Sequence, residues 1–96
     1  MYGTVARLQL KPGAEASMVK LMEEFRSLNI SGFKGEFIYK TDANPNEYFM
    51  AVAFESKAAY QANANNPAQH QRFEQYRALL TADPEWHDGE IVYSVM

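Results

Sequence analysis

Two histidines are the side chains of this sequence best suited to acid–base chemistry. His70 is predicted one turn into a helix, beside an apolar stripe that includes Phe73, and imidazole titrates near neutral pH. His70 is therefore a candidate general base within reach of a cavity between helices and sheet; the alternative is an exposed histidine near a helix cap. His87 follows Trp86 in a loop, where the indole either stacks on an aromatic ligand or packs the loop against the body.

Other catalytic patterns are weak or missing from the sequence. The acidic turn around His87 is more typical of a solvated loop than of a metal site, so we expect no metal. The chain has no cysteine, which excludes disulfides, thiolate metal sites and cysteine nucleophiles. It also has no phosphate-binding loop, no dinucleotide fingerprint and no Gly-x-Ser-x-Gly motif, so no familiar nucleotide or flavin site is indicated.

Length and composition predict one ordinary globular domain over residues 1–96. Apolar residues make up 47% of the chain and charged residues 22%, which argues against disorder. The formal net charge of −3 argues against nucleic acid or an anionic membrane as partner. The sequence has no hydrophobic leader and no apolar span long enough for a transmembrane helix, so we expect a cytoplasmic protein.

Hydrophobic periodicity predicts the elements that would position these side chains. Alternating patterns predict four strands, over Tyr2–Leu10, Phe33–Thr41, Glu47–Glu55 and Asp88–Met96. Apolar residues at helical spacing predict a helix from Met18 to Leu28. Ser56 and Asn66 are predicted N-caps of two further helices, over Lys57–Ala64 and from Pro67 onward.

The order β-α-β-β-α-β predicts an α+β fold of the ferredoxin-like kind, a four-stranded antiparallel sheet with helices on one face. The strand at residues 47–55 is apolar on both sides, so the other face of the sheet needs cover too. We place on that face Val5, Ile38, Phe49, Ala51, Ala53 and part of the last strand. Pairing of two sheets in a homodimer would bury roughly 600–1,000 Å² per partner; the alternative is a monomer with a small apolar face.

Arg7 is expected on the same face. A partly buried arginine there needs an acidic partner, which we predict to be Glu36 or an acid of the other subunit.

Two short motifs carry a resemblance to a known family. Residues 54–60, Phe-Glu-Ser-Lys-Ala-Ala-Tyr, mark the break from strand to helix, and residues 66–70, Asn-Pro-Ala-Gln-His, open the next helix. With the element order, they resemble the antibiotic-biosynthesis-monooxygenase-like proteins, which are dimeric α/β-barrels. The resemblance covers nearly the whole chain, and its motifs are more specific for fold than for chemistry.

The resemblance implies a cofactor-independent monooxygenase that acts on a small aromatic or quinol substrate, bound in an apolar pocket in each subunit of a homodimer. His70 would be its base, and Asn63, Phe73 and Trp86 would be pocket residues. The haem-degrading relatives use an Asn, a Trp and a His where this chain has Ala6, Asn63 and Phe73, so we expect no haem and no other cofactor. The rival hypothesis is a non-catalytic ligand-binding or stress-related protein of the same fold.

Overall fold

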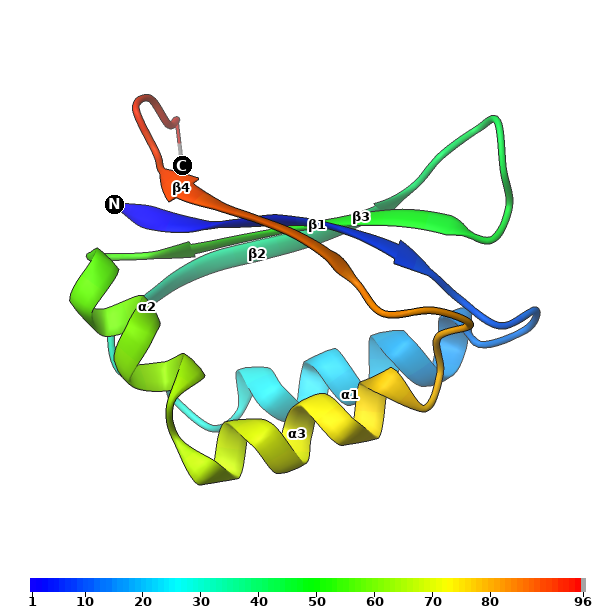
Figure 1. Ribbon diagram of the computed structural model, residues 1–96, viewed down its shortest axis with the longest axis horizontal. Coiled ribbons are helices and arrows are strands. Elements are labelled where there is room, and N and C mark those ends of the chain that lie inside the picture. Colours follow the sequence, from blue (N-terminus) through cyan, green and yellow to red (C-terminus); the bar gives the residue numbers. More distant parts are fainter. Residues whose placement is uncertain (96) are drawn as a thin grey trace.

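A computed structural model of the protein describes residues 1–95 and shows a single four-stranded antiparallel sheet with three helices (Figure 1). The strands lie in the order β2-β3-β1-β4, so the first strand pairs with the third and the fourth. In chain order the elements are β1 (Tyr2–Gln9), α1 (Glu15–Arg26), β2 (Phe33–Lys40), β3 (Glu47–Phe54), α2 (Lys57–Ala64), α3 (Pro67–Arg77) and β4 (Glu85–Glu90).

The helices all lie on one side of the sheet. Figure 1 shows α1 and α3 side by side beneath the strands, while α2 descends from one end of the sheet toward α3. The predicted ferredoxin-like α+β layout is therefore confirmed, and the sheet of a single chain is open. None of the helices within residues 1–95 combines the length and hydrophobicity that a bilayer crossing requires.

Local signals start α2 and α3 where the sequence predicted them, whereas α1 begins at Glu15 and ends at Arg26, earlier than the predicted Met18–Leu28. The Ser56 hydroxyl accepts a hydrogen bond from the Ala59 N–H at 3.0 Å, and the Asn66 side-chain oxygen accepts one from the Ala68 N–H at 2.9 Å. Gly32 has φ +78°, and a Cβ there would lie 2.6 Å from the Ala59 side chain. Glycine is thus required between α1 and β2, both for its backbone angle and for the close approach of α2.

The core lies between the sheet and the ends of α1 and α3. Leu8, Leu10, Met18 and Leu80 are its most completely buried large side chains. Leu10 also bridges to Leu80 through the backbone, which ties the end of β1 to the segment after α3. This end of the molecule is tightly packed, whereas the opposite end, near α2, is hollow.

The last strand lies earlier in the sequence than predicted. The structure places β4 at Glu85–Glu90, whereas the prediction was Asp88–Met96. Pairing with β1 runs from Arg7 opposite Glu85 to Tyr2 opposite Glu90, so residues 91–95 extend past the end of β1 and form no strand. Met96 lies outside the described residues. The apolar alternation of the tail suggested a strand, but the register of β1 determines where the strand forms.

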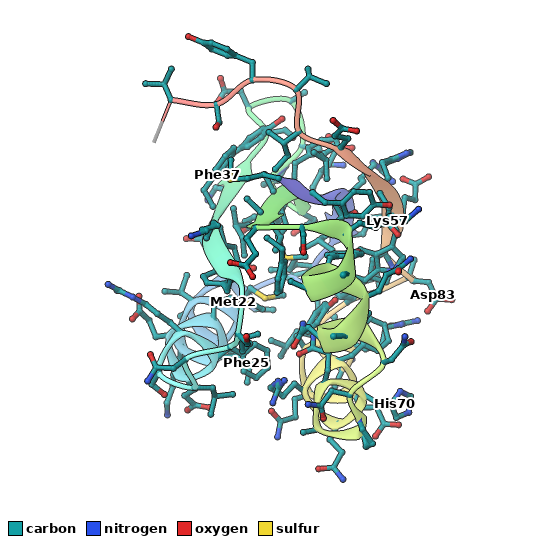
Figure 2. All side chains as sticks on the ribbon, turned by 90° about the vertical axis from the view of Figure 1, so that its left-hand side faces the viewer. Met22, Phe25, Phe37, Lys57, His70 and Asp83 are labelled. Carbon is teal, nitrogen blue, oxygen red and sulfur yellow. The ribbon has the colours of Figure 1, made fainter. Side chains whose placement is uncertain are left out.

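The prediction that Ile38 lies on the uncovered face is wrong. Ile38 pairs with Met50 and therefore faces the helices, together with Glu36. The opposite face carries the stacked rings of Phe37, Tyr39 and Phe49, with centroids 6.4 and 5.6 Å apart. Phe37 is 62% exposed and projects away from the helices (Figure 2). The uncovered face therefore carries an aromatic cluster on β2 and β3, while β4 adds Glu85 and His87 to it in place of the apolar residues that were predicted.

Arg7 has an acidic partner on this face, but not the one predicted. Its guanidinium group donates to Glu47 at 2.6 Å and to Glu85 at 3.0 Å. Glu36 is not its partner because it points to the other side of the sheet. The Arg7 guanidinium lowers the pKa of the Glu47 carboxyl by a direct hydrogen bond.

Truncation of a core side chain tests this packing. Leu8→Ala should lower the free energy of unfolding by about 2–5 kcal/mol, because the Leu8 side chain is wholly buried and its neighbours cannot collapse fully into the space. Val19→Ala, at a position on α1 that is 55% exposed, is the matched control and should change it by about 0.5 kcal/mol or less. Urea unfolding followed by circular dichroism measures both. Equal effects of the two substitutions would contradict the described core.

Candidate functional site

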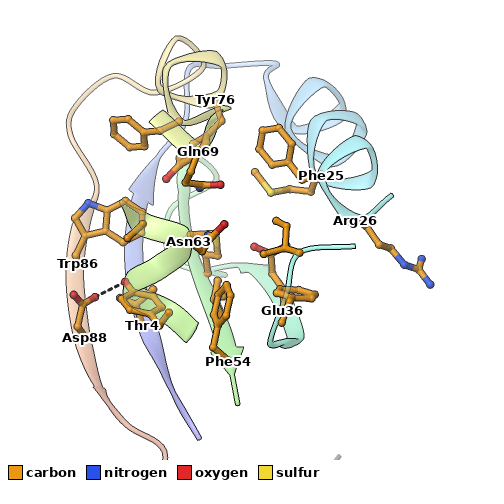
Figure 3. A pocket seen from close by; sticks show the side chains of 18 of the residues that line it. Thr4, Phe25, Arg26, Glu36, Phe54, Asn63, Gln69, Tyr76, Trp86 and Asp88 are labelled. Carbon is orange, nitrogen blue, oxygen red and sulfur yellow. Dashed lines mark hydrogen bonds between the residues drawn. The ribbon is translucent and has the colours of Figure 1, made fainter. Parts of the chain in front are cut away.

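A cavity of about 850 Å³ opens between the sheet and the helices. Its floor is the helix-facing side of β1, β3 and β4, and its walls come from α1, α2, α3 and β2 (Figure 3). The cavity exists because α1 and α3 pack against the sheet at one end only, while α2 covers the other end from the side. It is large enough for an aromatic ligand of two or three rings.

Most of the lining is apolar and aromatic. Met22 and Phe25 project from the side of α1 that faces α3 (Figure 2), and Phe73 and Tyr76 face them from α3. The Phe73 and Tyr76 rings pack edge to face at 5.1 Å. Such walls favour flat hydrophobic molecules.

Three of the predicted site residues meet at this cavity. Asn63 extends its carboxamide from α2 toward the centre, and Trp86 lines one side from β4 itself, not from the predicted loop (Figure 3). Phe73 lies 6.2 Å from Trp86 between ring centroids. Trp86 is 43% exposed, so its indole borders the opening as well as the interior. The structure brings together Asn63, Phe73 and Trp86, although they come from three separate elements.

His70, the predicted base, lies at the rim of the cavity. Its side chain is 73% exposed, and Nε2 lies 3.1 Å from a carboxylate oxygen of Glu74. Figure 2 shows His70 on the outer side of α3. To reach a ligand in the interior, the imidazole must leave Glu74 and turn inward.

The acidic turn considered as a metal site is divided by the pleat of β4. Glu85 and His87 lie opposite Arg7 and Val5 on the uncovered face, whereas Asp88 lies opposite Thr4 and faces the cavity. These side chains therefore do not converge.

The sequence analysis missed a hydrogen-bonded polar pair beside the floor, formed between α2 and β4. The Tyr60 hydroxyl donates a 2.8 Å hydrogen bond to Asp88, drawn as a dashed line in Figure 3. Burial, reinforced by this hydrogen bond, raises the pKa of Tyr60 above the range of a free tyrosine. Thr4 lies beside them on β1; it is 6% exposed, and its hydroxyl has the Tyr60 hydroxyl as a polar neighbour but forms no hydrogen bond of good geometry among the described residues. A threonine on the same strand face as Ala6 and Leu8 was the available signal.

Glu36 is a further polar residue that the sequence analysis did not assign to the site. It extends from β2 into the cavity on the side away from Asp88 (Figure 3). Burial by the surrounding protein raises the pKa of the Glu36 carboxyl. The side chain still contacts solvent, because the cavity is open. An apolar cavity with a few polar groups at opposite ends is suited to an aromatic ligand that carries oxygen substituents.

The family model for antibiotic biosynthesis monooxygenases matches residues 1–79. With its ferredoxin-like fold and helix-to-sheet cavity, this chain belongs to the antibiotic biosynthesis monooxygenase family. A search of curated proteins gave no match.

Solved structures of similar fold extend over nearly the whole chain. SnoaB, a cofactor-independent oxygenase from Streptomyces nogalater, has a TM-score of 0.80 and 17% identity, over 98% of this chain and 95% of its own. A protein of unknown function from Nitrosomonas europaea has a TM-score of 0.75 and 24% identity, over 99% and 92%. A conserved protein from Methanosarcina mazei Go1 has a TM-score of 0.77 and 17% identity, over 92% and 89%. At these identities the likeness establishes the fold.

Titration of Tyr60 tests the geometry of the floor. Because its folded pKa is raised, the stability it contributes is complete below about pH 10 and is lost as pH rises through the folded value. Tyr60→Phe should therefore lose less unfolding free energy than the wild type between about pH 9 and pH 11. Urea unfolding at each pH measures this difference.

Asp88→Asn is the control for the hydrogen bond. It removes the charged acceptor but leaves the hydroxyl buried, so its loss should lie between those of the wild type and Tyr60→Phe. Equal losses in all three proteins would contradict the described environment of Tyr60.

Proposed function

We propose that this protein is a cofactor-independent monooxygenase whose substrate is a small aromatic molecule or quinol, bound in the helix-to-sheet cavity. The observation that carries this proposal is the cavity itself, an aromatic-lined space with isolated polar groups in a member of this family. The fold similarity to SnoaB, a cofactor-independent oxygenase, also supports it.

Oxidation of an anthrone by O₂ needs few catalytic groups from the protein. An anthrone loses a proton from its ring system, and the resulting carbanion donates electrons to O₂, so that a hydroperoxide forms at that carbon. The hydroperoxide carbon then loses its remaining hydrogen as a proton while the O–O bond breaks, so that one oxygen leaves as water and the other becomes a new carbonyl. The substrate supplies all four electrons and O₂ is the oxidant, so the residues need only bind the ring, exclude water and accept a proton.

Each predicted residue has a role in this reaction. His70 would accept the proton from the rim, and Glu74 at 3.1 Å would stabilise the resulting imidazolium. Asn63 would donate a hydrogen bond to the oxyanion that develops on the ring. Phe73 and Trp86 would hold the ring between them and shield it from water.

Oxygen consumption tests the activity. With anthrone or 1,4-naphthohydroquinone, the wild type should take up O₂ faster than buffer, and His70→Gln should lower kcat by about 10²–10⁴-fold, the usual contribution of a general base. Gln71→Ala, at an exposed position on the same helix, is the matched control and should retain wild-type kcat. Uptake no faster than buffer with every substrate would refute the oxygenase.

The exposed position of His70 favours a second candidate function. A base with 73% of its side chain exposed and a carboxylate partner is not preorganised for proton transfer in the interior. A binding protein that holds an aromatic ligand without converting it would need no such base. In that case His70→Gln would leave ligand affinity unchanged, and no variant would show turnover.

We further propose that two copies of the chain pair through the uncovered face of the sheet. Phe37, Tyr39 and Val5 on this face are 62%, 53% and 46% exposed. Exposed apolar groups gathered on one face are typical of an interface. Two copies related by a two-fold axis would bury this face and close the two open sheets into a barrel.

Light scattering coupled to size-exclusion chromatography tests the pairing. At micromolar concentration the wild type should have twice the mass of one chain, and Phe37→Asp should shift it toward the monomer, because a buried unpaired charge opposes association. Val19→Asp, on the exposed face of α1, is the matched control and should remain dimeric. A monomeric wild type would contradict the pairing.

A further inference from the structure

Glu36 occupies an unusual position for a carboxylate. The register of β2 places it opposite Val52 on the helix-facing side of the sheet, next to Ile38. Figure 3 shows its side chain directed into the cavity, from the wall across from Trp86 and Asp88. A strand residue on the inner side of a sheet is usually apolar. Glu36 is instead exposed to the water of the open cavity, so a ligand that displaced this water would have to supply a partner for the carboxylate.

No basic side chain among residues 1–95 forms an ion pair with Glu36. Arg26 lines the same cavity, but its side chain points away into solvent (Figure 3) and pairs with Glu23 at 3.8 Å. The other titratable side chains that line the cavity are Tyr60 from α2, His70 and Tyr76 from α3, and Asp88 from β4. Lys34 lies two residues away on β2 and is exposed. The interior therefore has two carboxyl groups and no inward-pointing cation.

The two carboxyl groups differ in what they contact. Asp88 already accepts the hydrogen bond of Tyr60 at 2.8 Å, whereas burial is the one influence on the pKa of the Glu36 carboxyl. A ligand that displaced water from the cavity would bury the Glu36 carboxyl further. The carboxylate would then be stabilised best by a hydrogen bond donated by the ligand itself.

Thr4 supplies a second polar group in the floor. It is 6% exposed and lines the cavity, and its hydroxyl has the Tyr60 hydroxyl as a polar neighbour but forms no hydrogen bond of good geometry among the described residues. Buried hydroxyl groups in folded proteins are normally hydrogen-bonded. Thr4 and Glu36 thus present a hydroxyl and a carboxylate on different strands, with the apolar surface of Met50 and Val52 in the same cavity.

We propose that Glu36 and Thr4 bind two oxygen substituents of a neutral aromatic ligand, and that Glu36 excludes anionic ligands. The Glu36 carboxylate accepts a hydrogen bond from a ring hydroxyl, and the Thr4 hydroxyl bonds to an oxygen elsewhere on the ring. This inference rests on the ligand class of the proposed function and narrows it to uncharged ligands with at least one hydroxyl group. Carboxylated aromatic molecules are rejected, because their charge would face Glu36 without a cation between.

A pair of matched probes tests the selection against anions. 2-Naphthol and 2-naphthoate share a ring system, but only the second is an anion at pH 7. The wild type should bind 2-naphthol at least tenfold more tightly, and Glu36→Gln should reduce this preference by about tenfold or more through a gain in 2-naphthoate affinity. Isothermal titration calorimetry measures both affinities. The fluorescence of Trp86, the single tryptophan, reports occupancy of the cavity.

Two variants act as controls for the preference of the protein for 2-naphthol over 2-naphthoate. Glu24→Gln removes a carboxylate from the exposed surface of α1 and should keep the wild-type preference, which excludes an effect of net charge alone. Gln71→Ala, at an exposed position on α3, should also keep it. A gain in affinity for an anion cannot result from unfolding, so Glu36→Gln tests the role of Glu36 even if it lowers stability.

The Thr4 contact has its own test. 2,6-Dihydroxynaphthalene carries a second hydroxyl and should bind the wild type more tightly than 2-naphthol, and Thr4→Val should remove that advantage while leaving 2-naphthol affinity within about twofold. Retention of the advantage in Thr4→Val would overturn the role of Thr4.

The remaining outcomes distinguish a failure of the proposed role of Glu36 from a failure of the proposed oxygenase activity. Failure of the wild type to bind 2-naphthol, or an unchanged preference in Glu36→Gln, would overturn the role of Glu36 even if oxygen uptake is found. Binding with the expected preference but no oxygen uptake would support Glu36 and refute the oxygenase alone.

Discussion

The register of β3 is the constraint on which the rest of the structure depends. This strand lies between β2 and β1, and its side chains alternate between two apolar sets. Tyr48, Met50, Val52 and Phe54 face the helices, where they supply core and cavity floor; Phe49, Ala51 and Ala53 face the other way. A shift of β3 by one residue would exchange the two sets. Met50 and Val52 would then leave the cavity floor, and Glu36 and Thr4 on the neighbouring strands would lose the apolar surface beside them.

The cavity is a consequence of how the helices meet this strand. Leu8, Met18 and Leu80 close the space at one end of the sheet by tight packing. At the other end, Gly32 lets α2 approach the start of β2, so that α2 forms a side wall and leaves the middle open. The polar groups of the site are therefore held by strands and helices of the scaffold, which fixes their positions better than loops would.

Much of this fold could be predicted from the sequence because its signals are local. Ser56 and Asn66 cap helices, Gly32 adopts a positive φ, and strand-like runs bounded by turn residues mark the first three strands. The position of β4 and the face of Ile38 were not predictable in the same way, because they depend on pairing between segments far apart in the chain. The apolar tail after Glu90 looked more like a strand than Glu85–Glu90, yet only the latter lies opposite β1.

The site was predicted in part for the same reason. Asn63, Phe73 and Trp86 lie on faces that periodicity and a family resemblance can identify, and all three line the cavity. Helical spacing put His70 near the apolar stripe, but it could not show that the imidazole turns outward toward Glu74. Glu36 was predicted to pair with Arg7, but the two side chains lie on opposite faces of the sheet. The face on which Glu36 lies follows from the register of β2 with β3, which the sequence alone does not give.

Methionine methyl resonances offer the most direct test that this cavity is a ligand site. Met22 and Met50 line it from α1 and β3, whereas Met1 lies outside it. In a carbon-13 methyl NMR titration with 2-naphthol, the Met22 and Met50 signals should shift together and saturate at one ligand per chain, while the Met1 signal stays in place. Saturation of binding with Met22 and Met50 unmoved would contradict the account.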